Sequence, residues 1–193
     1  KFADVPISLE NLAELQRNLV RSHSAGVGPS FSQEEVRAAM LLRANALARG
    51  MSGVRPQVVE TIVEMLNKGV TPFVPEKGSV GASGDLAPLA HIALVIIGEG
   101  EAFYKDELMP GKQAMDEAGI KPCKLEAKEG LALTNGVQMT NGVLALTVDT
   151  GRTLAKAADI IASLTGQVLQ VIEDAYDDGI LVLRSQDGAR EVG

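Results

Sequence analysis

The sequence lacks three features that each mark a class of protein: cysteine pairs, an excess of basic residues and long apolar runs. Cys123 is the one cysteine in 193 residues, which excludes a disulfide framework and fits a reducing cytoplasm. Lys and Arg number 18 against 25 Asp and Glu, so no basic stripe is present to neutralise nucleic-acid phosphates. The longest apolar run, Leu86 to Ile97, contains His91 and is too short to cross a bilayer. We therefore expect a cytoplasmic protein that binds neither nucleic acid nor membrane.

The two ends of the sequence predict a piece of a longer polypeptide. The first residues, Lys1 to Asp4, lack a starting methionine and the charged-then-apolar pattern of a secretory signal. The last residue, Gly193, follows no structural stop signal. Between them, 46% hydrophobic and 22% charged residues are typical of a globular protein with one full core.

Apolar periodicity and helix-end signals predict that nearly the whole chain is helical. Ser32 and Glu35 have the spacing of a capping box, and Gly50 ends the helix that they begin. Pro56 suits the first turn of the next helix, which runs to Lys68.

The same signals predict the remaining elements. These are a helix capped by Ser8, a loop from Ser22 to Pro29, an extended glycine-rich loop from Gly69 to Gly84, an entirely apolar and buried helix that Asp85 caps, a hairpin of 102–104 with 107–109, a short helix over 112–118, and a long helix from Gln138 to Tyr176. A helix as long as the last is usually part of a large bundle.

The stretch from Gly78 to His91, GSVGASGDLAPLAH, is the most informative part of the sequence, and three interpretations fit it. The first is a loop before a capped, buried helix, since Ser-Gly-Asp is common at such places. The second is an anion site, because free N–H groups and the helix dipole favour negative charge. Its glycine spacing, G-x-x-G-x-x-G, and the missing Lys-Ser/Thr of a P-loop disfavour a nucleotide. The third is cyclisation of the backbone.

Cyclisation would turn Ala82-Ser83-Gly84 into an electrophile. The amide nitrogen of Gly84 would attack the carbonyl carbon of Ala82, an approach that small residues permit. Loss of water closes a five-membered ring, and loss of water from Ser83 leaves an exocyclic methylene. The electron-poor product would lie at a helix N-terminus, where the dipole stabilises added negative charge. No standard side chain offers such an electrophile.

The stretch Gly78–His91 resembles the signature of the histidine and phenylalanine ammonia-lyase family, in which Ala-Ser-Gly becomes the 4-methylidene-imidazol-5-one (MIO) group. The resemblance covers essentially the whole chain. Within the family, the sequence is most similar to the bacterial histidine enzymes. Further segments resemble the family in the same order: Leu15–Leu19, Ser22-His23, Gly26–Gly28, Arg43–Leu47, Gly98–Glu101 and Lys128–Gly136.

The resemblance implies a cofactor made by the chain itself, with no external cofactor and no metal. It assigns catalytic roles to Ala82, Ser83, Gly84 and Asn135, substrate binding to Ser22 and His23, and support of the cofactor to Asp85. Gln138 lies one helical step beyond Asn135, so we expect it to face the same site and bind substrate. By itself, the sequence indicates that Asn135 is a turn residue before Gly136, that His23 is a surface or core histidine, and that Asp85 is a helix cap.

Other residues that could carry chemistry are expected to be structural. His91, on an apolar helix, is expected to be a hydrogen-bonded core histidine, and Cys123 has no neighbouring histidine to form a catalytic pair. The pairs Glu34-Glu35 and Asp177-Asp178 are expected to be solvated or to cap helices, and no metal-ligand spacing is present.

The resemblance further implies an all-α fold. A MIO-forming domain would cover residues 1–136, and the start of a long-helix bundle like that of fumarase and aspartase would cover 137–193. The complete protein would be a homotetramer whose active sites combine several subunits. The pair Ser22-His23 is the one expected for L-histidine, converted to trans-urocanate. The alternatives are a tyrosine or phenylalanine ammonia-lyase or aminomutase of the family, and an inactive helical fragment that acts only as a scaffold.

Some of the family's pattern is missing or altered. The family's catalytic tyrosine loop would precede Lys1, and its later tyrosine, arginine and glutamate motifs would lie beyond Gly193. The stretch Arg184–Gly188 resembles the family's Arg-Pro-His-x-Gly but lacks its Pro and His, and Thr134–Gln138 departs from Leu-Asn-Gly-Thr-Gln. We therefore expect the isolated segment to be inactive, because the base and the carboxylate-binding residues are absent.

Overall fold

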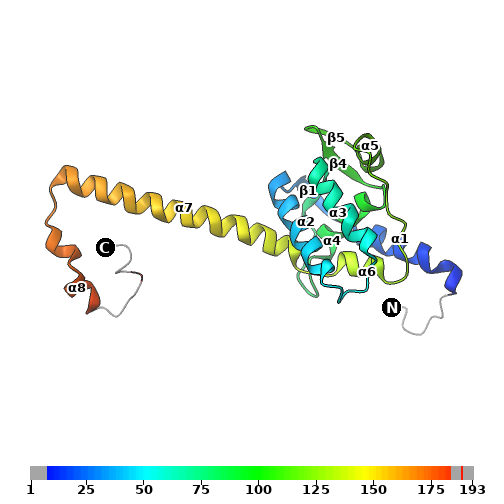
Figure 1. Ribbon diagram of the computed structural model, residues 1–193, viewed down its shortest axis with the longest axis horizontal. Helices are drawn as coiled ribbons and strands as arrows, with labels where there is room; N and C mark the ends of the chain where they lie inside the picture. The colour runs from blue at the N-terminus through cyan, green and yellow to red at the C-terminus, as the bar shows by residue number, and fades with distance from the viewer. Residues whose placement is uncertain (1–7, 184–187, 189–193) are drawn as a thin grey trace. The chain divides into compact units, whose positions relative to one another are not determined.

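The computed structural model describes residues 8–183 and residue 188, and its elements are mostly helices, which confirms the prediction of an all-α fold (Figure 1). Contacts divide the chain into two compact units, Lys1–Leu146 and Thr147–Gly193. The first unit contains the Gly78–His91 stretch. Among the described residues, no helix is both long enough and apolar enough to span a membrane.

Helix α4 (Leu86–Ile96) is the central helix of the first unit, as its uniformly apolar sequence predicts. Eight of its eleven residues are buried. The helices packed against it are α1 (Leu12–His23), α3 (Pro56–Lys68), α5 (Gly111–Glu117) and α6 (Glu129–Thr134). Burial of this apolar helix on several sides stabilises the unit.

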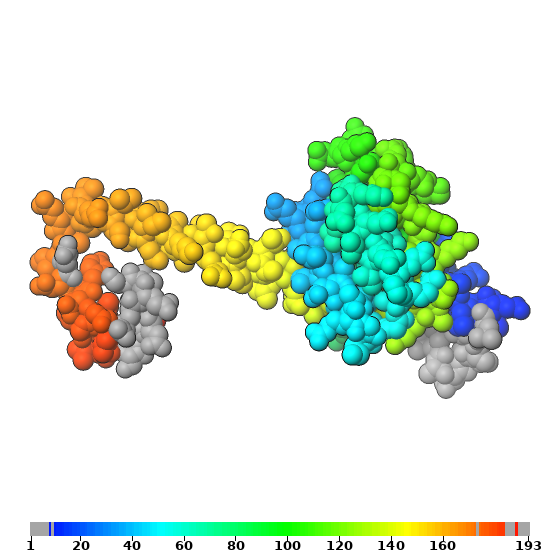
Figure 2. All heavy atoms as spheres, in the orientation of Figure 1, coloured from blue at the N-terminus to red at the C-terminus, as the bar shows by residue number. Residues whose placement is uncertain are grey.

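Helices α2 (Gln33–Ala48) and α3 begin and end where local signals predict. The Ser32 hydroxyl accepts from the amide of Glu35 at 3.3 Å, and the Glu35 carboxylate accepts from the amide of Ser32 at 2.9 Å, which completes the capping box. Helix α3 starts at Pro56 and ends before Gly69, whose φ of +77° is left-handed. The two helices pack together and form much of the face seen in cyan in Figure 2.

A three-stranded antiparallel sheet, in the order β2-β4-β5, lies at one edge of the first unit. Its strands are β2 (Thr71–Pro72), β4 (Glu101–Tyr104) and β5 (Glu107–Pro110). The predicted hairpin is confirmed, because Tyr104 pairs with Glu107 across a turn in which Lys105 and Asp106 have positive φ.

Two loop predictions are wrong in part. Helix α1 continues through His23, and Val27–Ser30 form strand β1, so Ser22–Pro29 is not a simple loop. Strand β1 pairs with β3 (Pro75–Lys77), inside the stretch expected to be an extended loop. This pairing joins residues almost fifty positions apart, and local periodicity carries no signal for it.

The first and last predicted helices also need correction. The helix expected to start at Ser8 is preceded by a 3-10 turn over Leu9–Asn11, in which the Asn11 amide donates to the Ser8 carbonyl at 3.1 Å. Helix α7 runs over Gln138–Leu169 and not to Tyr176, because Gln170 turns left-handed with φ of +53°.

Helix α7 belongs to the first unit at its start. There Gly142 lies so close to α2 that a Cβ on it would come within 2.9 Å of the Ala39 backbone. The second unit continues with the 3-10 turn η2 (Glu173–Tyr176) and α8 (Asp178–Val182). The Asp177 side chain caps α8 by accepting from the Gly179 amide at 2.8 Å, as its acidic pair predicts. Of the Arg184–Gly188 resemblance, residues 184–187 lie outside the described residues.

Candidate active site

The loop that carries Ala82, Ser83 and Gly84 connects β3 to α4. Ala82 and Ser83 are exposed, whereas Gly84 is buried with φ of +136°. A Cβ on Gly84 would lie 2.5 Å from the carbonyl oxygen of Gly136 and 2.9 Å from its nitrogen. Only glycine fits there, because both the backbone angle and the neighbouring backbone exclude a side chain. The structure thus presses the end of Ala82-Ser83-Gly84 against the segment that follows Asn135.

Asp85 ties this loop to α7. It occupies the predicted cap position of α4, but the prediction that its side chain caps this helix is wrong. Its carboxylate makes no cap bond to α4. It accepts from the backbone amide of Thr140 at 2.8 Å and from the Thr140 hydroxyl at 2.8 Å, and the Ser79 hydroxyl donates to it at 3.1 Å. Thr140 is the third residue of α7, so Asp85 caps α7 across the fold. The Asp85 amide also donates to the Gly136 carbonyl at 2.6 Å.

Arg43, on α2, is a candidate site residue to which sequence reasoning gave no role. Its side chain is buried, and its guanidinium donates to the Gln138 side-chain oxygen at 2.8 Å and to the Asn135 carbonyl at 3.0 Å. It also donates to the Ala132 carbonyl. A signal was available, because Arg43 occupies a core position of α2. The other buried residues of this helix are Val36, Ala39, Met40, Ala44 and Leu47, at helical spacing.

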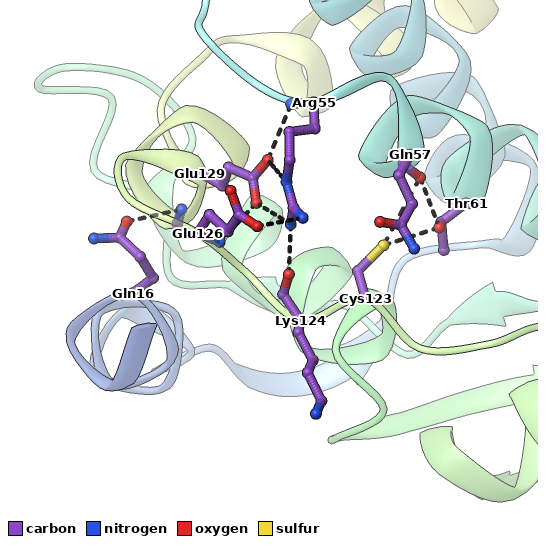
Figure 3. Close-up of polar contacts among 9 residues, drawn as sticks. Gln16, Arg55, Gln57, Thr61, Cys123, Lys124, Glu126 and Glu129 are labelled. Atoms are coloured by element: carbon purple, nitrogen blue, oxygen red, sulfur yellow. Dashed lines mark hydrogen bonds and ion pairs between the residues drawn. The ribbon is translucent and has the colours of Figure 1, made fainter. Parts of the chain in front are cut away.

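Helix α6, which leads to Asn135, is fixed at its start by an ion pair between Arg55 and the buried carboxylate of Glu129 (Figure 3). The Glu129 carboxylate, 2% exposed, accepts from Arg55 side-chain nitrogens at 2.8 and 2.9 Å and from the Glu126 amide at 2.8 Å. Burial alone would raise the pKa of Glu129, but these hydrogen bonds and the charge of Arg55 outweigh it and lower the pKa. Gln16 of α1 accepts from the Gly130 amide at 3.0 Å, so α6 is held from two sides.

Ser22 and His23 are the last two residues of helix α1. The loop that follows them contacts the stretch Gly78–His91. The Nδ1 atom of His23 lies 2.8 Å from the Leu19 carbonyl oxygen, and the Ser22 hydroxyl is turned back onto the same carbonyl at 2.9 Å. Three residues after His23 lies Gly26, and a Cβ on Gly78 would lie 3.0 Å from its Cα. The structure thus brings the loop after His23 against the start of Gly78–His91. It turns the Ser22 hydroxyl into helix α1.

His91 and Cys123 have the structural environments that the sequence predicts. The Gly26 amide donates to Nε2 of His91 at 3.2 Å, and burial lowers the pKa of this histidine. Burial also raises the pKa of the Cys123 thiol, which lies 3.0 Å from the Thr61 hydroxyl (Figure 3). Within the part of the chain that the structure describes, no group of His, Cys, Asp and Glu is arranged to hold a metal ion.

Three comparisons with known proteins identify the family of the chain. The sequence model of the family described as "Aromatic amino acid lyase" matches residues 1–193. The chain is 53% identical to the histidine ammonia-lyase of Alkaliphilus metalliredigens over 99% of its own length, and 55% identical to that of Natranaerobius thermophilus over 97%. It spans only 38% and 37% of the length of these two relatives.

Solved structures give the same result. The phenylalanine aminomutase of Pantoea agglomerans superimposes with a TM-score of 0.93 at 36% identity, over 99% of this chain and 37% of that one. The histidine ammonia-lyase of Trypanosoma cruzi superimposes with a TM-score of 0.91 at 35% identity, over 97% of this chain and 37% of that one. The fold and the sequence together show that this chain belongs to the aromatic amino acid lyase family.

Proposed function

We propose that this chain is part of an ammonia-lyase that converts L-histidine to trans-urocanate and ammonia without oxidation. One observation carries the proposal: curated histidine ammonia-lyases are 50–55% identical to the chain over 95–99% of its length. The activity would belong to the complete protein, because this chain spans only 38% and 37% of the length of the two relatives named above.

We infer that Ala82, Ser83 and Gly84 form MIO. The fit of the loop supports this inference, because Gly84 has a backbone angle and a backbone neighbour that only glycine tolerates, while Ser83 is exposed. The group supplies an electrophile that weakens the bond between the substrate's α-carbon and its amine. Asp85 would support the loop, since its buried carboxylate anchors the residue after Gly84 to α7.

The remaining roles belong to groups that bind and orient the substrate. Asn135 is exposed on the segment that touches Gly84, so its amide is available to the substrate or the loop. Gln138 lies one helical step further and is oriented by Arg43. His23 and Ser22 would line the pocket on the side of the substrate ring. The His23 ring is held by Nδ1, which lies 2.8 Å from the Leu19 carbonyl oxygen.

Assembly as a cytoplasmic homotetramer is part of the proposal. The only buried residues of α7 are Met139 and Gly142, both near its start. Apolar side chains are exposed along the rest of it: Leu144, Val148, Leu154, Ile160, Ile161, Leu164, Val168 and Leu169. Such side chains are normally covered by other helices. In this proposal residues 1–136 form the MIO domain and 137–193 begin the bundle.

The test is made on the full-length chain, with Ser83→Ala against Ser32→Ala. Intact mass and a tandem spectrum across Val74–His91 should show a deficit of two waters in the unsubstituted chain. Ser83→Ala should abolish both the deficit and the release of ammonia. Ser32→Ala removes a hydroxyl from a helix cap, costs about 1 kcal/mol of stability, and should retain both. If the unsubstituted chain shows the unmodified mass, the lyase proposal is contradicted and the inactive scaffold is the alternative that remains.

A second candidate is an aminomutase or a lyase of the same family with another aromatic substrate. It is favoured by the TM-score of 0.93 with a phenylalanine aminomutase and by 45% identity to the tyrosine aminomutase of Streptomyces globisporus over 81% of this chain. Product analysis with histidine, tyrosine and phenylalanine separates the candidates. A lyase releases ammonia and an unsaturated acid, whereas an aminomutase retains the nitrogen in a β-amino acid.

A further inference from the structure

Arg43 is a buried cation that is not neutralised by a carboxylate. The residue is 4% exposed, and no ion pair joins it within the part of the chain that the structure describes. Its Nε–H is the one buried side-chain polar group without a hydrogen-bond partner among the described residues. Burying a charge in this way is costly, so its position calls for a reason beyond packing.

The hydrogen bonds of Arg43 all go to one short segment. Its Nη1 donates to the Gln138 side-chain oxygen at 2.8 Å, and its Nη2 donates to the carbonyls of Asn135, at 3.0 Å, and of Ala132. These carbonyls lie at the end of α6, where the helix itself leaves them without donors. A planar guanidinium can hold three acceptors in fixed directions, which the single ammonium of lysine does poorly.

Gly136 links Arg43 to the Ala82–Gly84 loop. On one side, a Cβ on Gly136 would lie 2.3 Å from Nη1 of Arg43 and 2.1 Å from the side-chain oxygen of Gln138. On the other side, the Gly136 carbonyl oxygen lies 2.5 Å from where a Cβ on Gly84 would be, and it accepts from the Asp85 amide at 2.6 Å. The guanidinium is therefore separated from the loop by the thickness of one glycine backbone.

We propose that Arg43 is a positioning residue for the reaction. It fixes the Asn135–Gly136 backbone and the Gln138 amide, and so determines how the Asn135 side chain meets the Ala82–Gly84 loop. The inference rests on the proposed function. Burial lowers the pKa of Arg43 to about 10, which still leaves it a cation at neutral pH, so its hydrogen bonds are charge-assisted.

The experiment uses the full-length chain and compares Arg43→Lys with Arg37→Lys. Both arginines lie on α2, and Arg37 likewise donates to a carbonyl near the end of a helix, that of Leu66 at 3.1 Å, but outside this segment. Loss of charge-assisted hydrogen bonds by Arg43→Lys should lower kcat by about 10- to 100-fold while KM changes by less than about threefold. Arg37→Lys should leave both constants unchanged. Both variants should retain the two-water deficit.

A double-mutant cycle with Asn135→Ala tests whether Arg43 acts through Asn135. In that background, Arg43→Lys should lower kcat by less than about threefold, because the group that it positions is gone. Additive effects of Arg43→Lys and Asn135→Ala on kcat would overturn this inference but leave the proposed function standing. So would an Arg43→Lys variant with a lower melting temperature and an unchanged kcat. If the unsubstituted chain releases no ammonia from any aromatic amino acid, the proposed function falls, and this inference falls with it.

If Arg43→Lys does not fold, Gly136→Ala replaces it. The added methyl must displace the ends of the Arg43 and Gln138 side chains, both of which are flexible, while Arg43 itself remains. The same fall in kcat is expected, and a normal kcat would overturn the inference.

Discussion

The Asp85 carboxylate accepts both the backbone amide and the hydroxyl of Thr140, each at 2.8 Å, and so joins the start of α4 to the first turn of α7. Asp85 is 3% exposed and directly follows Gly84. This one buried carboxylate follows the Ala82–Gly84 loop directly and caps a helix 55 residues away. It also accepts from the Ser79 hydroxyl, which belongs to the same loop. The geometry of the loop therefore depends on where α7 begins.

Asp85→Asn should weaken this connection more than Thr140→Val does. The asparagine can still accept from the Thr140 amide and donate to the two hydroxyls, but it removes the negative charge that strengthens these bonds and complements the N-terminus of α7. We expect this to cost about 2 kcal/mol, whereas Thr140→Val removes one hydroxyl donor for about 1 kcal/mol. Thermal unfolding of the full-length chain measures the difference, and intact mass reports the fraction that has lost two waters. We expect a lower melting temperature and a smaller modified fraction for Asp85→Asn. Equal melting temperatures for the two variants would contradict this account.

Gly84→Ala should prevent cyclisation of the Ala82–Gly84 backbone, and Gly69→Ala is its control. Both glycines have positive φ, at +136° and +77°, so alanine is strained at each. Nothing lies within 4 Å of a Cβ on Gly69, whereas a Cβ on Gly84 would meet the Gly136 backbone at 2.5 Å. Gly69→Ala should therefore cost about 1 kcal/mol and keep the two-water deficit. Gly84→Ala should lose the deficit, and a fully modified Gly84→Ala chain would refute the close-approach argument.

Elements defined by local signals were predictable from the sequence. The capping box at Ser32, the proline at the start of α3 and the left-handed Gly69 at its end act within one turn of helix, and the structure has all three. The buried character of α4 follows from its composition alone. The Lys105-Asp106 turn was predictable for the same reason, because the strands that it joins are adjacent in sequence.

Features that depend on distant partners were not predictable. Asp85 stands at a cap position, but its acceptor oxygens are taken by Thr140, and no local pattern indicates this competition. The pairing of β1 with β3 is also non-local. Arg43 differs, since a charged residue at a core position of α2 is visible in the periodicity. Its partners, at the end of α6, are visible only in the fold.

Glu129→Gln should destabilise the start of α6, with Glu126→Gln as its control. Both carboxylates bind Arg55, but the Glu129 side chain is 2% exposed and that of Glu126 is 66% exposed. Glu129→Gln replaces a buried acceptor that Arg55 and the Glu126 amide use, and should cost about 2 kcal/mol. Glu126→Gln changes an exposed pair and should cost less than about 1 kcal/mol. Thermal unfolding at pH 7 measures both, and similar losses would show that burial does not govern this pair.

The difference in melting temperature between the unsubstituted chain and Glu129→Gln should also depend on pH, in a defined direction. Because the folded pKa of Glu129 is lowered, its contribution is complete above the unfolded pKa of about 4.3 and is lost as the pH falls through the folded value. The gap in melting temperature between the unsubstituted chain and Glu129→Gln should be constant from about pH 5 to 8. It should narrow below about pH 4, and a gap that widens in acid would reverse the assigned sign.

Protonation of His91 should release the loop that follows His23. Nε2 of His91 accepts from the Gly26 amide at 3.2 Å, and a protonated imidazole has no acceptor to offer. Burial lowers the folded pKa, so this contribution is complete above the unfolded pKa of about 6.5 and is lost as the pH falls through the folded value. Protection of Ser24–Val27 against hydrogen exchange, measured relative to the unfolded chain, should fall over that range.

Two variants separate the two histidines. His91→Gln supplies an oxygen acceptor that does not titrate and should make the protection independent of pH, whereas His23→Gln should keep the pH dependence. If His23→Gln abolishes the pH dependence of the protection instead, the contact between Gly26 and His91 is not its cause.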